Sequence, residues 1–508
     1  MKFYSITLRR NSPGILFLFL LSLSLSVGAQ VSTSSPYSRY GVGDLQLGGF
    51  SKNLGMGGLG FAISQPYNVN FTNPASYSAI TLTTFEAAGS ASMYELHDAS
   101  SPHAYQYNAD VAYLAMGFPL KAKKWGFSFG LLPYSNVGYN IADKQTNAYS
   151  GDVEYHLYEG SGGLNQFYMG TGLSLGKNFH VGVNASFLFG TIDQLRRVEY
   201  PSNAYYNAKV TEETIVNDFY FSGGVLKIFD SLSIAKSDSI VLFEKRIVLY
   251  LDSVAKLRKQ MAAMQGDSAT AGPETAAKKE SITQIIAGLN RQILSADSAR
   301  EKVRVRRQKS GWSLAIGLTG SPSLSLKAKH TQLAQSYYYS NTVEYIRDTI
   351  YNLQDQKGKL VLPLSLGFGL SLKQGSRWIT GIDLSLQNWQ DYSLFGEKDS
   401  LANSWRASGG FQFTPNDRSV KSYFNLVQYR FGGHFEQTYL QLRNSKLTDY
   451  GLSLGFGFPM KRIATTIQIA IEAGRRGTIA DNLVELNYVK CTIGFTLNDR
   501  WFIKPKFD

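Results

Sequence analysis

The first candidate for chemistry is the stretch LGMGGLGF at residues 54–61, in which Gly55, Gly57 and Gly60 have the GxGxxG spacing. In dinucleotide-binding proteins this spacing lets a loop wrap a pyrophosphate, provided that a buried strand precedes it and a helix follows it. Here GGFSKNL precedes the glycines, FAISQPYNV follows them, and the next acidic residue is Glu86. The context therefore excludes an NAD or FAD site, and we expect no cofactor.

The other reactive residue types show no catalytic or metal-binding spacing. The six histidines are scattered without an HExxH motif, and no GxSxG motif offers an activated serine. Arg430, His434 and Glu436 share one face of a predicted strand, and Asp383 and Glu472 lie similarly on theirs. Arg430, His434 and Glu436 are either an acid–base cluster or, as we favour, part of a polar network in a lumen, to which Asp383 and Glu472 also belong. We expect the protein not to be an enzyme and to bind no metal.

A regular alternation of apolar and small residues runs through the chain and must position these groups. In VLPLSLGFGLSLK (361–373), Leu or Phe at every second position alternates with Gly, Ser and Pro, and residues 179–190 and 449–458 repeat the pattern. A β-sandwich would carry Lys, Glu and Thr on its second face. A small-residue face better suits a lumen behind a lipid-facing surface. The pattern therefore predicts an all-β transmembrane protein, an outer-membrane β-barrel.

Fourteen segments follow this pattern, an even number that is typical of bacterial outer-membrane barrels. The predicted antiparallel strands span 81–97, 107–121, 125–142, 162–176, 179–195, 217–230, 311–329, 360–373, 377–395, 404–414, 426–443, 447–460, 464–476 and 485–498. Short connections follow several even-numbered strands, and long ones, at 143–161, 196–216 and 330–359, follow odd-numbered strands. Because such barrels have short periplasmic turns and long external loops, both termini are predicted to be periplasmic.

The N-terminus predicts export. Basic residues precede an apolar stretch at 15–25, and small residues end at Ala29, so residues 1–29 resemble a signal peptide. A membrane anchor is the weaker alternative because the stretch is short. The single cysteine, Cys491, excludes an intrachain disulfide. Charged residues make up 18% of the chain, and 48 glycines are present, which favours the Gram-negative outer membrane over a soluble enzyme.

Residues 231–310 lose the alternation and show helical spacing in two halves separated by GDSATAGPE at 266–274. This predicts a helical hairpin of coiled-coil type, with arms of about 26 residues and roughly 40 Å. Because it follows an inward-running strand, it should hang in the periplasm. It either stiffens the loop as a self-contained coiled coil or docks a periplasmic partner through residues 236–308.

The formal net charge of +13 suggests a nucleic-acid function, but its distribution argues against one. Residues 236–309 hold 15 Lys and Arg against 8 Asp and Glu, and the rest of the exported chain is nearly balanced. An exported protein rarely meets nucleic acid, so we expect no nucleic-acid partner. The basic run KVRVRRQK (302–309) is either solvated or near anionic lipid head groups.

Residues 30–80 precede the first strand and are rich in Gly, Ser, Asn and Pro, yet they also contain Tyr37, Phe50 and Phe61. A fourteen-stranded barrel with inward Gly and Ser is too wide to be filled by its own side chains. We therefore predict that residues 30–80 form a plug inside the barrel. Its glycines would permit tight turns and close approach to the wall.

Three stretches of this plug, SPYSRYGVGDL, NLGMGGLGFA and NPASYSAI, followed by about fourteen strands, resemble FadL-type outer-membrane transporters, especially their Bacteroidetes-type branch. The C-terminus, EAGRRGTIADNLVELNYVKCTIGFTLNDRWFIKPKFD, is similar to the same branch. The resemblance covers the exported chain except 231–310. It implies passage of hydrophobic small molecules, long-chain fatty acid-like or aromatic, through a plugged barrel. The hatch motif would be Asn73-Pro74-Ala75, and we place the gate there and at the three glycines of the GxGxxG stretch.

Two other functions stay open. A structural or accessory barrel would use residues 236–308 to recruit a periplasmic protein in an assembly or secretion complex. A general porin would conduct ions, which a plug opposes. The expected partners are outer-membrane lipid and a hydrophobic small molecule, and in the accessory case a periplasmic protein. The predicted parts are the signal peptide (1–29), the plug, barrel strands one to six (81–230), the helical insert, and strands seven to fourteen with the tail (311–508).

Overall fold

The computed structural model of the protein describes residues 35–46, 49–98, 103–146, 151–176, 178–201, 205–229, 238–266, 273–443, 445–460 and 465–501. The predicted signal peptide and the tail after residue 501 lie outside these residues. Within the described ranges, no helix combines the length and the apolar character needed to cross a membrane.

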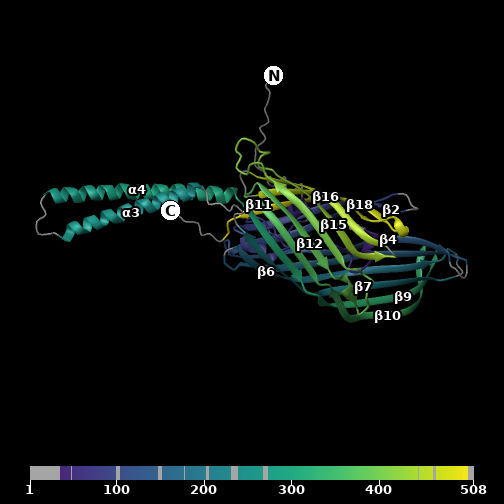
Figure 1. Cartoon of the computed structure of the whole chain (residues 1–508). Coiled ribbons are helices and arrows are strands. Elements are labelled where there is room, and N and C mark those ends of the chain that lie inside the picture. The colour runs from purple at the N-terminus through teal and green to yellow at the C-terminus, as the bar shows by residue number, and fades with distance from the viewer. Residues whose placement is uncertain are drawn as a thin grey trace, which may run out of the picture.

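Fourteen wall strands form a closed antiparallel barrel (Figure 1). Each pairs with its neighbours, and the last strand pairs with the first from Glu485 opposite His97 to Asp499 opposite Thr83. The strands are β2 (Thr83–His97), β3 (Ala104–Lys121), β4 (Trp125–Thr146), β5 (Val153–Ser174), β6 (Phe179–Glu199), β7 (Asn207–Phe229), β8 (Trp312–Ser321) continued by β9 (Leu324–Ser340), β10 (Val343–Leu362) continued by β11 (Ser365–Gln374), β12 (Trp378–Gln387), β14 (Ser404–Phe413), β15 (Gln428–Leu442), β16 (Ser445–Pro459), β17 (Thr465–Gly477) and β18 (Glu485–Asp499). The predicted barrel is confirmed.

Along each wall strand, apolar side chains point out of the barrel and alternate with small or polar side chains that point into it. On β16, Leu452 is 62% exposed and Ser453 only 1%, and on β6 the values are 59% for Val183 and 1% for Asn184. A soluble protein would bury its apolar face. The reverse arrangement, with small and polar residues inside, is that of a barrel whose outer surface contacts lipid.

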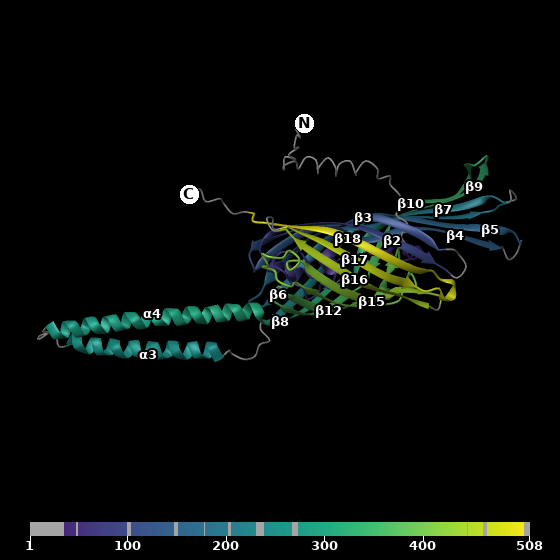
Figure 2. The same cartoon turned by 90° about the horizontal axis from the view of Figure 1, so that it is seen from above.

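Three segments predicted as long external loops are mostly strand, so that prediction was wrong. β4 extends to Thr146, β5 begins at Val153, and β9 and β10 take up most of 330–359. These extensions stand beyond the rest of the rim at one end of the barrel (Figure 2). Outside lipid both faces of a strand meet water, so apolar alternation stops while the backbone ladder continues.

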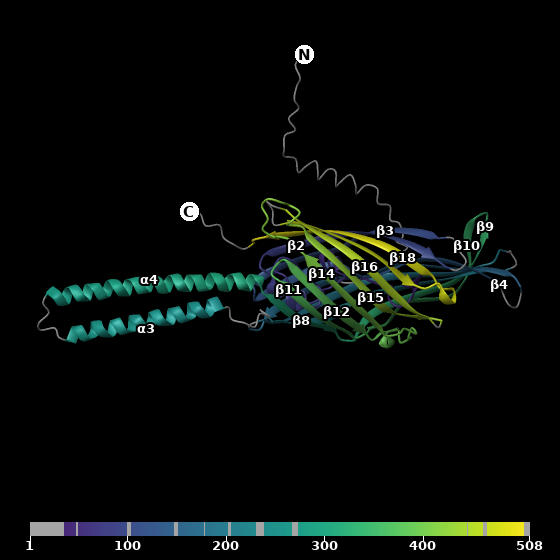
Figure 3. The same ribbon diagram turned by 45° about the horizontal axis from the view of Figure 1, so that its top comes forward.

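Helices α3 (Asp238–Gly266) and α4 (Pro273–Ser310) lie side by side and project from the other end of the barrel, where the short turns are (Figures 1 and 3). They have 29 and 38 residues, more than the 26 predicted for each arm. The difference arises mainly because α4 continues through the basic run KVRVRRQK almost to β8. Val254 of α3 is 5% exposed.

The described residues between 35 and 80, called the lumen segment below, lie inside the barrel. Inward-facing glycines spaced around the wall contact this segment so closely that an added Cβ would meet its backbone: Gly126, Gly172, Gly182, Gly317, Gly410 and Gly432. Because these glycines lie on six different wall strands, the segment must be surrounded by them. Its elements are η2 (Pro36–Arg39), β1 (Asp44–Leu45), α2 (Ser51–Leu54) and η3 (Pro74–Ala79); short elements elsewhere are η4 (Trp389–Asp391), β13 (Ser393–Leu394) and η5 (Ala480–Asn482).

Candidate functional site

The barrel wall has a gap between β3 and β4. The two strands are paired only between their connecting turn and the pair Leu114–Leu131. Beyond that pair, β3 remains paired with β2 and β4 with β5, but residues 104–113 and 132–146 form no ladder with each other. Pro133 lies where the unpaired part of β4 begins, a position that suits proline because it has no N–H to donate.

The free edge of β4 is bonded instead to the lumen segment. Strand β1 pairs antiparallel with Ser135 and Asn136 of β4, and Gly138 N donates to Ser38 Oγ at 3.1 Å. An unpaired backbone group in hydrocarbon costs several kcal/mol. The lumen segment therefore satisfies part of the edge that β3 leaves open.

An internal cavity of about 560 Å³ lies directly behind this gap. Its volume falls in the range of about 300–1,000 Å³ that small-molecule pockets occupy. The unpaired stretch of β3 lines it with Asn108, Asp110, Val111 and Ala112, and that of β4 with Leu132, Pro133, Ser135 and Asn136. The side of the cavity at the gap is therefore partly apolar and partly polar, and the charged residues Glu472, Arg476 and Lys490 line the side towards β17 and β18. We call this space the outer cavity.

Helix α2 separates the outer cavity from a second cavity. Phe50, just before α2, lines the outer cavity, whereas Lys52 lines the second. The Phe50 ring stacks on the ring of Tyr113, with centroids 4.0 Å apart, and Ser51 N donates to the Tyr113 hydroxyl at 3.1 Å. Tyr113 is the first residue of β3 beyond its pairing with β4, so α2 is attached at the margin of the gap.

The second cavity has a volume of about 850 Å³ and lies at the short-turn end of the barrel, next to the strands that lead to α3 and α4. Lys52 and residues 62–68 of the lumen segment form one side of it, and wall residues from β7, β8, β11, β12 and β14 to β18, with neighbouring turn residues, form the rest. Its charged lining residues are Lys52 and Lys373, both basic. We call this space the inner cavity.

The predicted hatch residues Asn73, Pro74 and Ala75 lie where the lumen segment meets β6 and β7. Asn73 Oδ1 accepts from Ala75 N at 3.0 Å and so begins η3, while its Nδ2 donates to the carbonyl of Phe61 at 2.5 Å. A Cβ added to Gly182 would lie 2.3 Å from the carbonyl carbon of Pro74. Pro74 and Ala75 are therefore in direct backbone contact with the wall, and Asn73 contacts it through its side chain.

The glycines of the GxGxxG stretch also lie against the wall. Gly57 N donates to Ser453 Oγ at 2.8 Å, and Gly60 N donates to Asp383 Oδ2 at 2.7 Å. Gly57 has a φ of +73°, and a Cβ on Gly55 would lie 2.8 Å from the backbone of β16. Left-handed backbone and close approach both require glycine.

Replacing Asp383 by alanine is expected to loosen this attachment. The Asp383 carboxylate also accepts from Phe61 N at 2.9 Å, so the change leaves two buried N–H groups without an acceptor, at about 1–3 kcal/mol each. Asp383→Asn keeps an acceptor oxygen and should cost less. Hydrogen exchange of residues 55–63, measured by mass spectrometry, should accelerate in Asp383→Ala much more than in Asp383→Asn. Equal exchange in wild type and both variants would contradict this role of Asp383.

The polar side chains that we predicted to form one luminal network make separate contacts. Arg430 donates to Gln412 Oε1 at 2.9 Å and to Gln468 Oε1 at 2.7 Å. Glu436 accepts from Arg406 at 2.9 Å. Asp383, as described above, holds the lumen segment, so these residues act in different places along the lumen.

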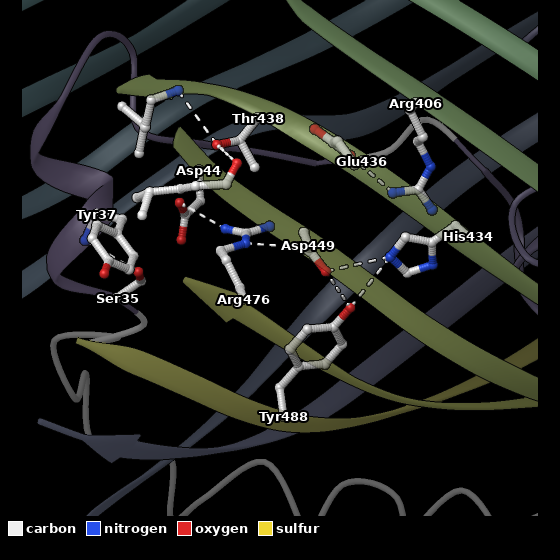
Figure 4. A network of polar contacts seen from close by, with 12 residues as sticks. Ser35, Tyr37, Asp44, Arg406, His434, Glu436, Thr438, Asp449, Arg476 and Tyr488 are labelled. Carbon is white, nitrogen blue, oxygen red and sulfur yellow. Dashed lines mark hydrogen bonds and ion pairs between the residues drawn. The ribbon is translucent and has the colours of Figure 1, made fainter. Parts of the chain in front are cut away.

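Tyr488 and Asp449 bring His434 and Glu472 together, and Figure 4 shows the first three of these side chains around one point. The Tyr488 hydroxyl, which has one proton to donate, lies within hydrogen-bond distance of both Asp449 Oδ1 (2.8 Å) and Glu472 Oε1 (3.2 Å). His434 Nε2 lies 3.4 Å from the same Asp449 oxygen. This group lines one side of the lumen between β15 and β18.

The same network reaches the lumen segment through Arg476 (Figure 4). Its guanidinium donates to Asp449 Oδ2 at 2.8 Å and to Asp44 Oδ1 at 3.0 Å. Because Asp44 belongs to β1, this double ion pair ties the lumen segment to β16 and β17. In the part of the chain that the structure describes, no group of three or more His, Cys, Asp or Glu is placed to hold a metal.

Sequence reasoning missed the residues that shape the gap and its cavity, among them Ala112, Tyr113 and Arg476. One signal was present in Pro133, which lies inside the predicted strand 125–142. A proline within a strand indicates an edge or a bulge, and it could have located the free edge of β4. No local signal pairs Arg476 with Asp44, which is 432 residues away in sequence.

These features define a class: a closed antiparallel barrel whose lumen holds its own N-terminal segment. The sequence model of the family described as BamG matches residues 13–253 and 304–508, and the chain belongs to the BamG family. The unmatched residues 254–303 lie in α3 and α4, apart from their connection. No curated protein has a significantly similar sequence.

Several solved structures are similar to the chain at low sequence identity. The CymD monoaromatic hydrocarbon channel has a TM-score of 0.49 and 10% identity, covering 89% of this chain and 98% of its own. The Pseudomonas putida toluene transporter TodX has a TM-score of 0.47 and 12% identity, covering 90% of this chain and 100% of its own. A Pseudomonas aeruginosa FadL homologue has a TM-score of 0.49 and 8% identity, covering 89% of this chain and 98% of its own. The structural neighbours are thus FadL-type channels and transporters for hydrophobic compounds.

Proposed function

We propose that the protein lies in the outer membrane of a Gram-negative bacterium and admits small hydrophobic molecules sideways, through the gap between β3 and β4. One observation carries the proposal: residues of both strands that border the gap, among them Ala112 of β3 and Leu132 of β4, line the outer cavity. A molecule dissolved in the outer leaflet would therefore reach the cavity without crossing the aqueous mouth of the barrel. The loops beyond the rim would be external and both termini periplasmic.

The lumen segment acts as the plug in this proposal. Helix α2 lies between the two cavities, and the stack of Phe50 on Tyr113 holds it at the margin of the gap. A molecule that displaced this stack would free α2 and join the cavities. The gate would then include the turn at Gly55, Gly57 and Gly60 and, on the opposite wall, the hatch residues at 73–75.

The test is uptake of naphthalene by Gram-negative cells that lack transporters of their own for it. Cells that produce the protein are expected to take up naphthalene several times faster than cells that carry an empty vector. A hydrophilic solute of similar size should enter both kinds of cell equally, since the proposed route starts in lipid. Equal naphthalene uptake with and without the protein would refute the proposal.

A second function, that of an accessory barrel which recruits a periplasmic protein, is favoured by the surface of α3. Four apolar side chains of this helix are at least half exposed: Leu242, Val248, Leu249 and Leu251. Apolar side chains clustered on one exposed helix are typical of protein contacts. The basic charge of 236–309 would select an acidic partner.

Affinity purification of the wild-type protein and of a variant with these four residues changed to glutamine tests the second function. A partner that is lost with the variant, while the barrel remains folded, would support it. The control changes four exposed polar residues of α4 to glutamine. An unchanged set of co-purified proteins would remove the accessory function.

A further inference from the structure

Strand β10 has a free edge beyond the rim of the barrel (Figure 2). One side of the strand pairs with β9 over the range Val343–Leu362. On the other side, the described residues provide a partner only near the rim, where β13 pairs with Leu360 and Val361 and Phe395 N donates to Lys359 O at 2.9 Å. The rest of that edge presents its backbone N–H and C=O groups to water. Native proteins normally shorten, cover or block such an edge, because it can pair with another strand.

Irregular pairing protects the middle of this edge but leaves its tip open. After Ile346 the register between β9 and β10 shifts at three places, and Thr349 N donates to Asp348 Oδ1 at 2.8 Å, so this N–H is not available to another chain. The tip, Val343–Ile346, instead pairs regularly with Tyr337–Ser340 of β9. None of the side chains that the structure describes is hydrogen-bonded to the backbone of the tip. Because the hydrogen bonds of an antiparallel strand alternate between its two sides, two of these four residues direct both backbone groups to the free side.

Three exposed tyrosines and an arginine form a row across this tip. Tyr345 is paired with Tyr338, and their ring centroids are 5.7 Å apart. The Tyr338 ring lies 6.2 Å from the ring of Tyr206, which precedes β7, and the guanidinium carbon of Arg347 lies 5.3 Å from the centre of the Tyr206 ring. The exposed fractions of the three tyrosines are between 41% and 55%. Tyrosine and arginine are among the residue types enriched at the energetic centres of protein interfaces.

The backbone tip is also nearly neutral. Its only carboxylate or basic side chain, Glu344, accepts from Arg197 at 3.1 Å and from Lys209. Ile346, next along the strand, is exposed. A partner at this edge would therefore meet aromatic and aliphatic side chains and an already paired carboxylate, which favours an uncharged segment over a polyanion or a strongly basic chain.

We propose that the tip of β10 is a docking site for an extended, uncharged segment of another polypeptide at the cell surface, which pairs with this edge as a further strand. A row of free N–H and C=O groups is matched along its length by another extended backbone. Alternate side chains of the segment would contact the three tyrosines, and the others would lie beside Ile346. A second copy of the protein does not fit, because copies in one membrane point the same way and cannot present their β10 edges to each other antiparallel, the arrangement in which β13 pairs with β10. The cell-surface location rests on the orientation proposed above, whereas binding itself needs no uptake.

Fluorescence anisotropy tests the site with the full-length protein in lipid nanodiscs and a labelled peptide of sequence TQLAQSYYYS, residues 331–340. In the protein this segment of β9 pairs with the other side of β10, so its side chains suit the same strand, and the peptide is expected to bind. The same peptide with N-methyl groups on its three tyrosines keeps every side chain but loses three N–H donors. It should bind at least about tenfold more weakly. Equal affinities of the two peptides, or no binding of either, would overturn the proposal.

The matching change in the protein is Tyr345→Lys. A lysine on an edge strand opposes further pairing, and the change also removes one ring of the tyrosine row, so the affinity for the unmethylated peptide should fall at least about tenfold. Tyr423→Lys, at an exposed tyrosine in the connection between β14 and β15, is the matched control and should bind like the wild type. Folding of each variant is checked by its heat-dependent shift in electrophoretic mobility. Wild-type affinity in folded Tyr345→Lys would overturn the proposal, as would dimers of the wild-type protein in detergent that the peptide dissociates, since the edge would then serve a second copy.

Discussion

Gly182→Ala is expected to push residues 73–79 away from the barrel wall and to make the barrel conduct ions. The added Cβ would lie 2.3 Å from Pro74 C, 2.4 Å from Pro74 O and 2.5 Å from Ala75 N. All three are backbone atoms, so no flexible side chain can give way. Overpacking of this kind costs typically about 1–3 kcal/mol, which changes the ratio of displaced to docked segment by roughly 5–150-fold. Conductance in planar lipid bilayers should rise accordingly.

The matched control is Gly409→Ala on β14. A Cβ at Gly409 would meet Ile382 Cγ2 at 3.7 Å and Gly381 O at 3.8 Å, which are ordinary van der Waals distances. This variant carries the same chemical change and should keep the conductance of the wild type. If Gly182→Ala conducts no more than Gly409→Ala, the contact at Pro74 does not keep the lumen closed, and the plug function assigned to this part of the lumen segment fails.

The barrel could be predicted from the sequence because its defining signal is local. Lipid outside and a crowded lumen inside impose a two-residue period on every wall strand, as in Leu452 and Ser453. The position of α3 and α4 at the short-turn end followed from the same count of strands. The extensions of β4, β5, β9 and β10 were missed, because a strand with water on both faces lacks that period.

The candidate site could be predicted only in part, because it depends on long-range pairing. The position of the lumen segment inside the barrel followed from the small residues of the wall strands. The pairing of β1 with the edge of β4, in place of β3, could not be predicted. Which of two strands pairs with a given edge has almost no effect on the local sequence pattern of either strand. The two glutamines that accept from Arg430 lie on two different strands, and no periodicity brings them together. Pro133 was the exception: because proline has no N–H, its place within a predicted strand indicates that this strand lacks a partner on one side.

Ala112→Trp is expected to close the lateral route and to lower the initial rate of naphthalene uptake at least about tenfold, equivalent to about 1.4 kcal/mol in the barrier. Ala112 belongs to the unpaired part of β3 and lines the outer cavity. An indole there would occupy the space between β3 and β4 that a hydrophobic molecule must cross. Its apolar surface suits this position, so the barrel should fold normally.

Ala109→Trp is the control, because Ala109 is an exposed residue of the same strand that does not line the outer cavity. It adds the same indole to the lipid-facing surface and should leave uptake unchanged. The double variant Gly182→Ala, Ala112→Trp then separates the two routes. If the passage is lateral, uptake stays low even though the lumen segment is displaced. If displacement restores uptake, molecules pass along the barrel axis, and the gap between β3 and β4 is not their entrance.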